Sequence, residues 1–195
     1  MKIQQLGFAL LVLLWLGVFA YLIVPKEMQL YGNFPHIILP AEPVDPRDLL
    51  QGDYVVLTYP FSDLNCSETE CDFAETPIQN SLRKILAEAQ IKDEIFVIFA
   101  ETENKRVRVT DFTTTKPSAN ELFLRGKIKN LAAHQLSLDF GLSKYFVPEG
   151  QGRDLELARN QNNLEVEVAL HPQSGQGLIV GILVNGQTYE FPQPE

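Results

Sequence analysis

The sequence contains few of the side chains from which metal and catalytic centres are commonly built. It has two cysteines and three histidines among 195 residues. The histidines (His36, His134 and His171) have no second histidine two or four positions away, so a zinc-finger scaffold is excluded and a histidine metal site has no local support. No G-x-S-x-G nucleophile elbow and no glycine-rich phosphate loop occurs. We therefore expect neither a metal site nor a cofactor.

Basic side chains are also in the minority. The chain carries 16 Lys and Arg against 25 Asp and Glu, for a formal net charge of −9. Nucleic-acid binding needs clustered basic residues, so this balance argues against a nucleic-acid partner. A hydrophobic fraction of 45% with 21% charged residues is typical of a globular chain and not of a disordered one. The length allows one domain with a short appendage.

One long stretch near the N-terminus has no charge at all. Residues 6–24 are uncharged and mostly apolar, and a helix of this length spans the roughly 30 Å hydrocarbon core of a bilayer. Lys2 precedes the run, while Lys26 and Glu27 behind it cancel, so the rest of the chain is predicted to lie outside the cytoplasm. The alternative is a signal peptide cleaved after Ala20, but the run exceeds the usual apolar core of about 7–15 residues. We predict an uncleaved single-pass anchor in the lipid bilayer.

The two cysteines are close together in the sequence. Cys66 and Cys71 are separated by four residues, so in an oxidising compartment they would close a small disulfide loop. Two free thiols are the alternative. A metal pair would need further soft ligands nearby, and a redox pair normally has C-x-x-C spacing. A structural disulfide agrees with export of this part of the chain.

Beyond the anchor, the pattern predicts a mainly β domain, all-β or α+β, with antiparallel pairing. We divide the chain into an anchor (1–27), a connector with a first strand (28–42) and a β-rich domain (43–195). One amphipathic helix is expected over 76–90, with Thr76 as its cap and Pro77 in the first position. Asn185-Gly186 predicts a two-residue hairpin turn. The expected strands are 36–39, 53–59, 94–101, 106–112, 122–129, 135–140, 163–171, 177–184 and 187–191.

Residues 43–52 have the pattern of a single helical turn that leads into a strand. Asp45 is suited to the N-cap and Pro46 to the first helical position. Asp48 would lie at the third position, near unpaired backbone N–H groups, and Gly52 can end the turn in a left-handed conformation. In the strand that follows, residues 53–59, both faces are mostly apolar. This predicts that the strand lies in the middle of a sheet.

The segment Gly52-Asp53-Tyr54-Val55-Val56-Leu57-Thr58-Tyr59 resembles the signature of the GDYXXLXY proteins at every fixed position. The lead-in 43–50, the segment 145–150 and the apolar N-terminus are also similar to that family. The resemblance implies a bacterial, membrane-anchored protein of the cell envelope, with its domain in the periplasm, whose partner is a polytopic membrane protein. It implies no reaction, because the family has no established activity.

The polar and apolar members of this region suggest different roles. Asp45, Pro46, Asp48, Gly52, Leu57 and Tyr59 can be explained as structural residues that cap, turn and pack. Asp53 begins a mostly buried strand and needs a partner there, for which Arg47 is the nearest candidate. Tyr54 could bind a ligand or fill the core. Glu149 is a second carboxylate that could meet Asp53, which gives the alternative hypothesis of an envelope hydrolase or ligand-binding enzyme.

The segment 60–75 carries five acids and no base. Calcium binding is an alternative, but the spacing does not match the D-x-D-x-D-G pattern, so a solvated acidic loop is favoured. The loop could also act as an adaptor for a basic partner. Together these observations favour a non-catalytic interaction module that binds a membrane or envelope partner.

Overall fold

The computed structural model describes residues 3–31, 34–44, 54–67, 71–73, 75–118, 120–147 and 164–189. The chain forms two compact units, Met1–Phe34 and Pro35–Glu195. The first unit contains helix α1 (Ile3–Tyr31), which extends beyond the predicted apolar run at both ends. No helix in the described part of the chain satisfies the length and hydropathy required of a membrane span. The span expected over residues 6–24 therefore stays a prediction.

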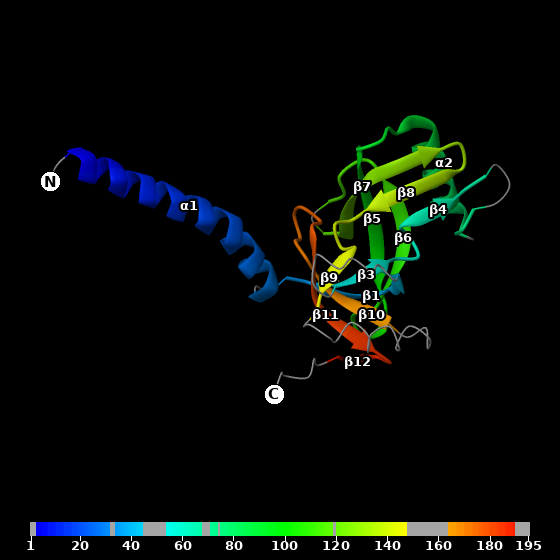
Figure 1. Cartoon of the computed structure of the whole chain (residues 1–195). Helices are drawn as coiled ribbons and strands as arrows, with labels where there is room; N and C mark the ends of the chain where they lie inside the picture. Colours follow the sequence, from blue (N-terminus) through cyan, green and yellow to red (C-terminus); the bar gives the residue numbers. More distant parts are fainter. Residues whose placement is uncertain are drawn as a thin grey trace. The chain divides into compact units, whose positions relative to one another are not determined.

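The second unit is built from three antiparallel sheets, as predicted for a mainly β domain (Figure 1). The largest sheet has the strand order β4-β8-β7-β5-β6. Its strands are β4 (Asp63–Asn65), β5 (Glu94–Glu101), β6 (Val107–Thr113), β7 (Leu122–Ala132) and β8 (Gln135–Asp139). Two register shifts interrupt its ladders, one between Ile98 and Phe99 and one between Ile128 and Asn130. At the second shift Lys129 is the extra residue of a β-bulge.

The other two sheets are smaller. The four-stranded sheet has the order β1-β10-β11-β12, and the three-stranded sheet has the order β2-β3-β9. The first of these contains β1 (His36–Pro40), β10 (Leu164–Leu170), β11 (Gly177–Val184) and β12 (Gln187–Thr188). The second contains β2 (Glu42–Val44), β3 (Tyr54–Thr58) and β9 (Lys144–Phe146). The signature strand β3 is therefore the central strand of its sheet, as predicted.

The amphipathic helix forms as α2 (Thr76–Glu88), which packs against β6. Ile78, Leu82 and Ile85 are buried on one side, in agreement with the predicted apolar face. The predicted cap was wrong by one residue: Glu75 occupies the N-cap position and makes no side-chain cap hydrogen bond. Pro77 is therefore the second helical residue and not the first, but it still lies in the first turn, where its missing N–H has no cost.

A single hydrophobic core joins the three sheets and α2. It includes Leu39 from β1, Leu57 from β3, Leu124 from β7 and Val166 from β10, each at most 2% exposed. Phe61 adds aromatic packing, with Phe99 and Phe140 placed edge-on to its ring at 5.7 and 5.3 Å between centroids. Because one core serves all the sheets, we expect this unit to unfold cooperatively.

Several short elements differ from the sequence expectations. Pro43 and Val44 lie in β2 and not in a helical turn, while the rest of that predicted turn, 45–52, is outside the described residues. The acidic segment contains strand β4, and β9 was not anticipated. The hairpin turn at Asn185-Gly186 is confirmed, with φ angles of 54° and 76°. Between β5 and β6 the turn contains a short 3-10 helix, η1 (Glu103–Lys105).

Candidate functional site

Most of the candidate residues from the sequence analysis lie outside the described part of the chain. These are Asp45, Pro46, Arg47, Asp48, Gly52, Asp53 and Glu149. The pairing of Asp53 with Arg47, the meeting of Asp53 with Glu149, and the enzyme hypothesis that depends on them therefore stay predictions. Tyr54, Leu57 and Tyr59 are described, so the site is built from their strand.

Strand β3 and Tyr59, the residue after it, alternate between a buried and a half-buried face. Val55, Leu57 and Tyr59 are at most 6% exposed. Tyr54, Val56 and Thr58 are half-buried on the opposite face. This follows from the two-residue period of a strand, which directs successive side chains to opposite sides of the sheet.

Tyr59 connects the end of the signature strand to the loop between β8 and β9. Its buried hydroxyl donates a hydrogen bond of 2.9 Å to the carbonyl oxygen of Leu142. The backbone N–H of Leu57 donates to the carbonyl oxygen of Ser143, also at 2.9 Å. Burial raises the pKa of the Tyr59 hydroxyl, so the group stays protonated and remains a donor. The strand thus positions residues 140–143.

Tyr54 lies on the outer face of the three-stranded sheet. Its ring centroid is 6.1 Å from that of Phe146, its partner across the β3–β9 ladder. The ammonium nitrogen of Lys144 is 5.0 Å from the same ring centroid, within range of a cation–π interaction. Phe146 is 66% exposed. Tyr54, Lys144 and Phe146, which we call the aromatic surface, form an apolar patch with a positive charge beside it.

A cleft lies beside the last residues of the signature strand. It has a volume of about 440 Å³, within the usual range for small-ligand sites. Its walls come from β3, from the turn that follows it, from the bulge in β7, from β8 and from the 140–143 loop. We call it the signature cleft. Its polar lining residues are Thr58, Ser62, Asp63, Lys129, Asn130, Ser137, Asp139 and Ser143.

The polar groups of the signature cleft differ in how well they are paired. Asp139 accepts a hydrogen bond of 2.9 Å from the backbone N–H of Gly141, and Thr58 donates to the carbonyl oxygen of Glu42 at 3.2 Å. Ser62 is only 8% exposed. Within the described residues, the Ser62 hydroxyl makes no hydrogen bond, and neither Asp63 nor Lys129 takes part in an ion pair. The cleft therefore presents unused donors and acceptors.

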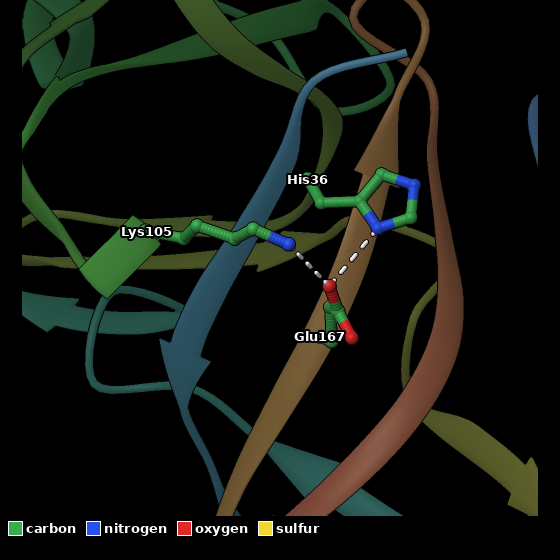
Figure 2. A network of polar contacts seen from close by, with 3 residues as sticks. All are labelled: His36, Lys105 and Glu167. Carbon is green, nitrogen blue, oxygen red and sulfur yellow. Dashed lines mark hydrogen bonds and ion pairs between the residues drawn. The ribbon is translucent and has the colours of Figure 1, made fainter. Parts of the chain in front are cut away.

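A second polar group, which we call the β10 cluster, lies on the outward side of β10. Figure 2 shows His36 from β1 and Lys105 from η1 approaching one carboxylate oxygen of Glu167. The His36 Nδ1 and the Lys105 Nζ are 3.0 and 3.2 Å from that oxygen. Because an ionised carboxylate only accepts, Nδ1 carries the proton in this contact. Partial burial alone would raise the pKa of Glu167, but the hydrogen bonds from His36 and Lys105 outweigh it and hold that pKa below its usual range.

The β10 cluster also includes Glu165, two residues before Glu167 on β10, and its partner Arg106. The Arg106 Nε and Nη2 atoms each lie 2.7 Å from one carboxylate oxygen of Glu165, in a bidentate pair. The hydrogen bonds and the charge of Glu165 raise the pKa of the guanidinium. All five residues of the β10 cluster (His36, Lys105, Arg106, Glu165 and Glu167) thus have polar partners within it, which is typical of a structural network.

The disulfide between Cys66 and Cys71 is present, so this prediction is confirmed. Two acids of the neighbouring acidic segment have internal partners: Asp72 accepts from Asn65, and Glu75 pairs with Arg108 at 2.8 Å. Among the described residues no group of three or more potential metal ligands occurs. Asp72 and Glu75 therefore have structural roles within the domain. Glu68 and Glu70, the other acids expected in the loop beside Asp63, lie outside the described residues.

The sequence model of the GDYXXLXY protein family matches residues 15–182. The chain belongs to the GDYXXLXY family. No curated protein and no solved structure matches the chain. Family membership thus agrees with the resemblance carried by the signature, and the described GDYXXLXY residues show where that signature lies in the fold.

Sequence analysis based on the GDYXXLXY signature missed the polar residues that line the cleft beside it. Ser62, Lys129 and Ser137 come from three separate segments, and Asp63 lies opposite Ser137 in the register of the β4–β8 ladder. The alternation of polar side chains at 135, 137 and 139 indicates one polar strand face. That face could have been predicted, but its meeting with the signature strand depends on long-range pairing.

Proposed function

We propose that the protein is a membrane-anchored cell-envelope protein whose periplasmic β domain is a non-catalytic interaction module for a membrane or envelope partner. The observation that carries this proposal is the apolar surface of α1. Each residue of Leu10–Leu16 is an exposed large hydrophobic side chain. Seven consecutive helical residues cover two turns, so apolar side chains lie on every side of that stretch. A bilayer removes such a surface from water at no polar cost.

Two further observations support an envelope location and a partner. The Cys66–Cys71 disulfide is typical of proteins in oxidising compartments. The aromatic surface exposes Phe146 beside Tyr54, and aromatic side chains of this kind are enriched where proteins bind one another. The GDYXXLXY family supplies no activity, so the partner and not a reaction is the focus of the test.

The anchor is tested by placing charge in the apolar run. The double variant Leu13→Arg/Leu16→Arg, compared with Leu13→Ile/Leu16→Ile, should release the full-length protein from membranes, because each arginine at mid-bilayer costs about 3 kcal/mol. A periplasm-dependent enzyme reporter fused at the C-terminus should be active for the isoleucine control. Release of the unmodified full-length chain without detergent, or an inactive reporter on the control, would contradict the anchor.

The partner is tested by site-specific crosslinking in intact cells. A photoreactive phenylalanine analogue at position 146 should give one discrete adduct with a membrane or envelope protein, whereas the analogue at position 84 on α2 should give none. Tyr54→Ser should abolish the adduct, because it removes one of the two aromatic rings of the aromatic surface. Equal crosslinking at both positions would argue against a specific interface.

A further inference from the structure

Within the described residues, the signature cleft combines a buried, unsatisfied hydroxyl with two charged side chains, Asp63 and Lys129, that take part in no ion pair. Ser62 follows the signature strand in a turn in which its backbone N–H donates to the carbonyl oxygen of Tyr59 at 2.9 Å. Its own carbonyl oxygen accepts from the N–H of Leu138 at 2.7 Å. The backbone of Ser62 is therefore fully paired, and only its hydroxyl, in the cleft lining, has no partner among the described residues.

Such a hydroxyl needs an explanation, because nearly all buried polar groups in folded proteins have a hydrogen-bond partner. Removing a hydroxyl from water without compensation is costly. A group that remains unsatisfied inside a cleft is therefore suited to pair with something that enters the cleft. The Ser62 hydroxyl can both donate and accept, so it fits a ligand that carries hydroxyl groups of its own.

The remaining lining supplies complementary hydrogen-bonding groups. Lys129, the bulge residue of β7, offers only donors, and Asp63 offers only acceptors. Asn130 and Ser137 offer both. Leu57, Leu138 and Leu142 also line the cleft and add apolar surface. We propose that the signature cleft binds a neutral saccharide unit, whose hydroxyls pair with Ser62, Asp63 and Lys129 and whose C–H faces pack on the leucines.

Charge favours a neutral ligand over an anionic one. The cleft lining contains two carboxylates, Asp63 and Asp139, against the single ammonium group of Lys129. The whole chain has a formal charge of −9. An anion would be repelled by this field, whereas a polyhydroxylated neutral molecule is not. The inference goes beyond the proposed envelope function and does not depend on whether α1 is an anchor.

The test uses the full-length protein in a detergent without a sugar headgroup, because an alkyl glycoside would occupy the cleft. Maltotriose and N,N′-diacetylchitobiose are titrated by calorimetry and saturation-transfer NMR. Glucose 6-phosphate and trialanine serve as anionic and peptide comparators. At least one saccharide should bind saturably, with a dissociation constant on the order of 1 mM, and more tightly than both comparators.

Matched variants connect binding to the cleft. Ser62→Ala and Lys129→Gln should each weaken saccharide binding by roughly 3- to 10-fold, as expected for the loss of one hydrogen bond. Ser81→Ala and Lys84→Gln on α2 should leave it unchanged. Lys129 is exposed, so its variant keeps the fold even if Ser62→Ala does not.

Three results would overturn the proposal. The first is the absence of saturable binding by both saccharides up to about 50 mM. The second is binding that Ser62→Ala and Lys129→Gln leave within twofold of the unmodified protein. The third is tighter binding of glucose 6-phosphate or trialanine than of either saccharide. None of these results bears on membrane retention or crosslinking, so failure here is distinguishable from failure of the envelope proposal.

Discussion

The β10 cluster and the signature cleft are both polar regions of the same unit, but their polar groups are paired to different extents. In the β10 cluster, Glu167 is shared by His36 and Lys105, and Glu165 holds Arg106 in a bidentate pair. In the described part of the signature cleft, the Ser62 hydroxyl has no partner and Lys129 makes no ion pair. The first region has internal partners, while the second has polar groups left for a molecule from outside.

This difference shows why charge alone does not identify a functional site. The β10 cluster has more charged residues and shorter contacts, yet its network holds η1 against β1 and β10. Partly exposed ion pairs of this kind contribute little stability each. The signature cleft has fewer charges, but its unpaired groups lie beside a strand that hydrogen bonds from Tyr59 and Leu57 connect to the 140–143 loop. Unpaired polar groups in a cleft are therefore a better indicator of binding than the number of charges.

The largest expected effect on stability is the difference between removing a paired hydroxyl, that of Tyr59, and an unpaired one, that of Ser62. Tyr59→Phe should lower the free energy of unfolding by about 1–2 kcal/mol, because the carbonyl oxygen of Leu142 loses its buried donor. Ser62→Ala should change it by less than about 0.5 kcal/mol, because its hydroxyl has no described hydrogen bond to lose. Urea denaturation of the full-length variants measures both values.

An equal loss of stability in the two variants would contradict the comparison. It would mean that the Ser62 hydroxyl is paired within the protein and is not left for a ligand. Unchanged urea dependence of the transition is the required control, since a changed slope would indicate an altered unfolded state.

Sequence patterns could predict the long strands, because each carries its own hydrophobic alternation. Residues 94–101 match β5 at both ends, and residues 177–184 match β11. β9 has only three residues and owes its existence to pairing with β3, so it has no pattern to detect. The signature cleft depends on the same kind of long-range pairing, between segments near residues 60, 129 and 138. No local rule specifies which distant strands will be neighbours.

A smaller effect on stability is expected when the pH is lowered, through the carboxylate of Glu167 in the β10 cluster. The pKa of Glu167 in the folded protein lies below its ordinary value of 4.5. The carboxylate therefore stabilises the fold above that pH, and the contribution is lost as the pH falls through the lowered folded-state pKa. Glu167→Gln should reduce stability at pH 6 by about 0.5 kcal/mol and make the fall below pH 4.5 shallower. Unfolding titrations from pH 6 to pH 3 test this.

The control for the acid experiment is Glu88→Gln on α2, whose side chain makes no ion pair or hydrogen bond with described residues. It should leave the slope of stability against pH unchanged. A slope that falls equally in both variants would mean that general charge repulsion, and not the contacts of Glu167 with His36 and Lys105, determines the acid response.

The smallest effect on stability is expected from substituting two lysines, Lys105 in the β10 cluster and Lys129 in the signature cleft. Lys105→Gln removes the ion pair with Glu167 and should lower stability by about 0.3 kcal/mol at low salt. Lys129→Gln removes no described ion pair and should have no measurable effect on the apo protein. About 1 M salt should abolish the difference between the variants, because the contact of Lys105 is partly exposed and screened. A larger loss for Lys129→Gln than for Lys105→Gln in parallel urea titrations would reverse the assignment of the structural and the binding region.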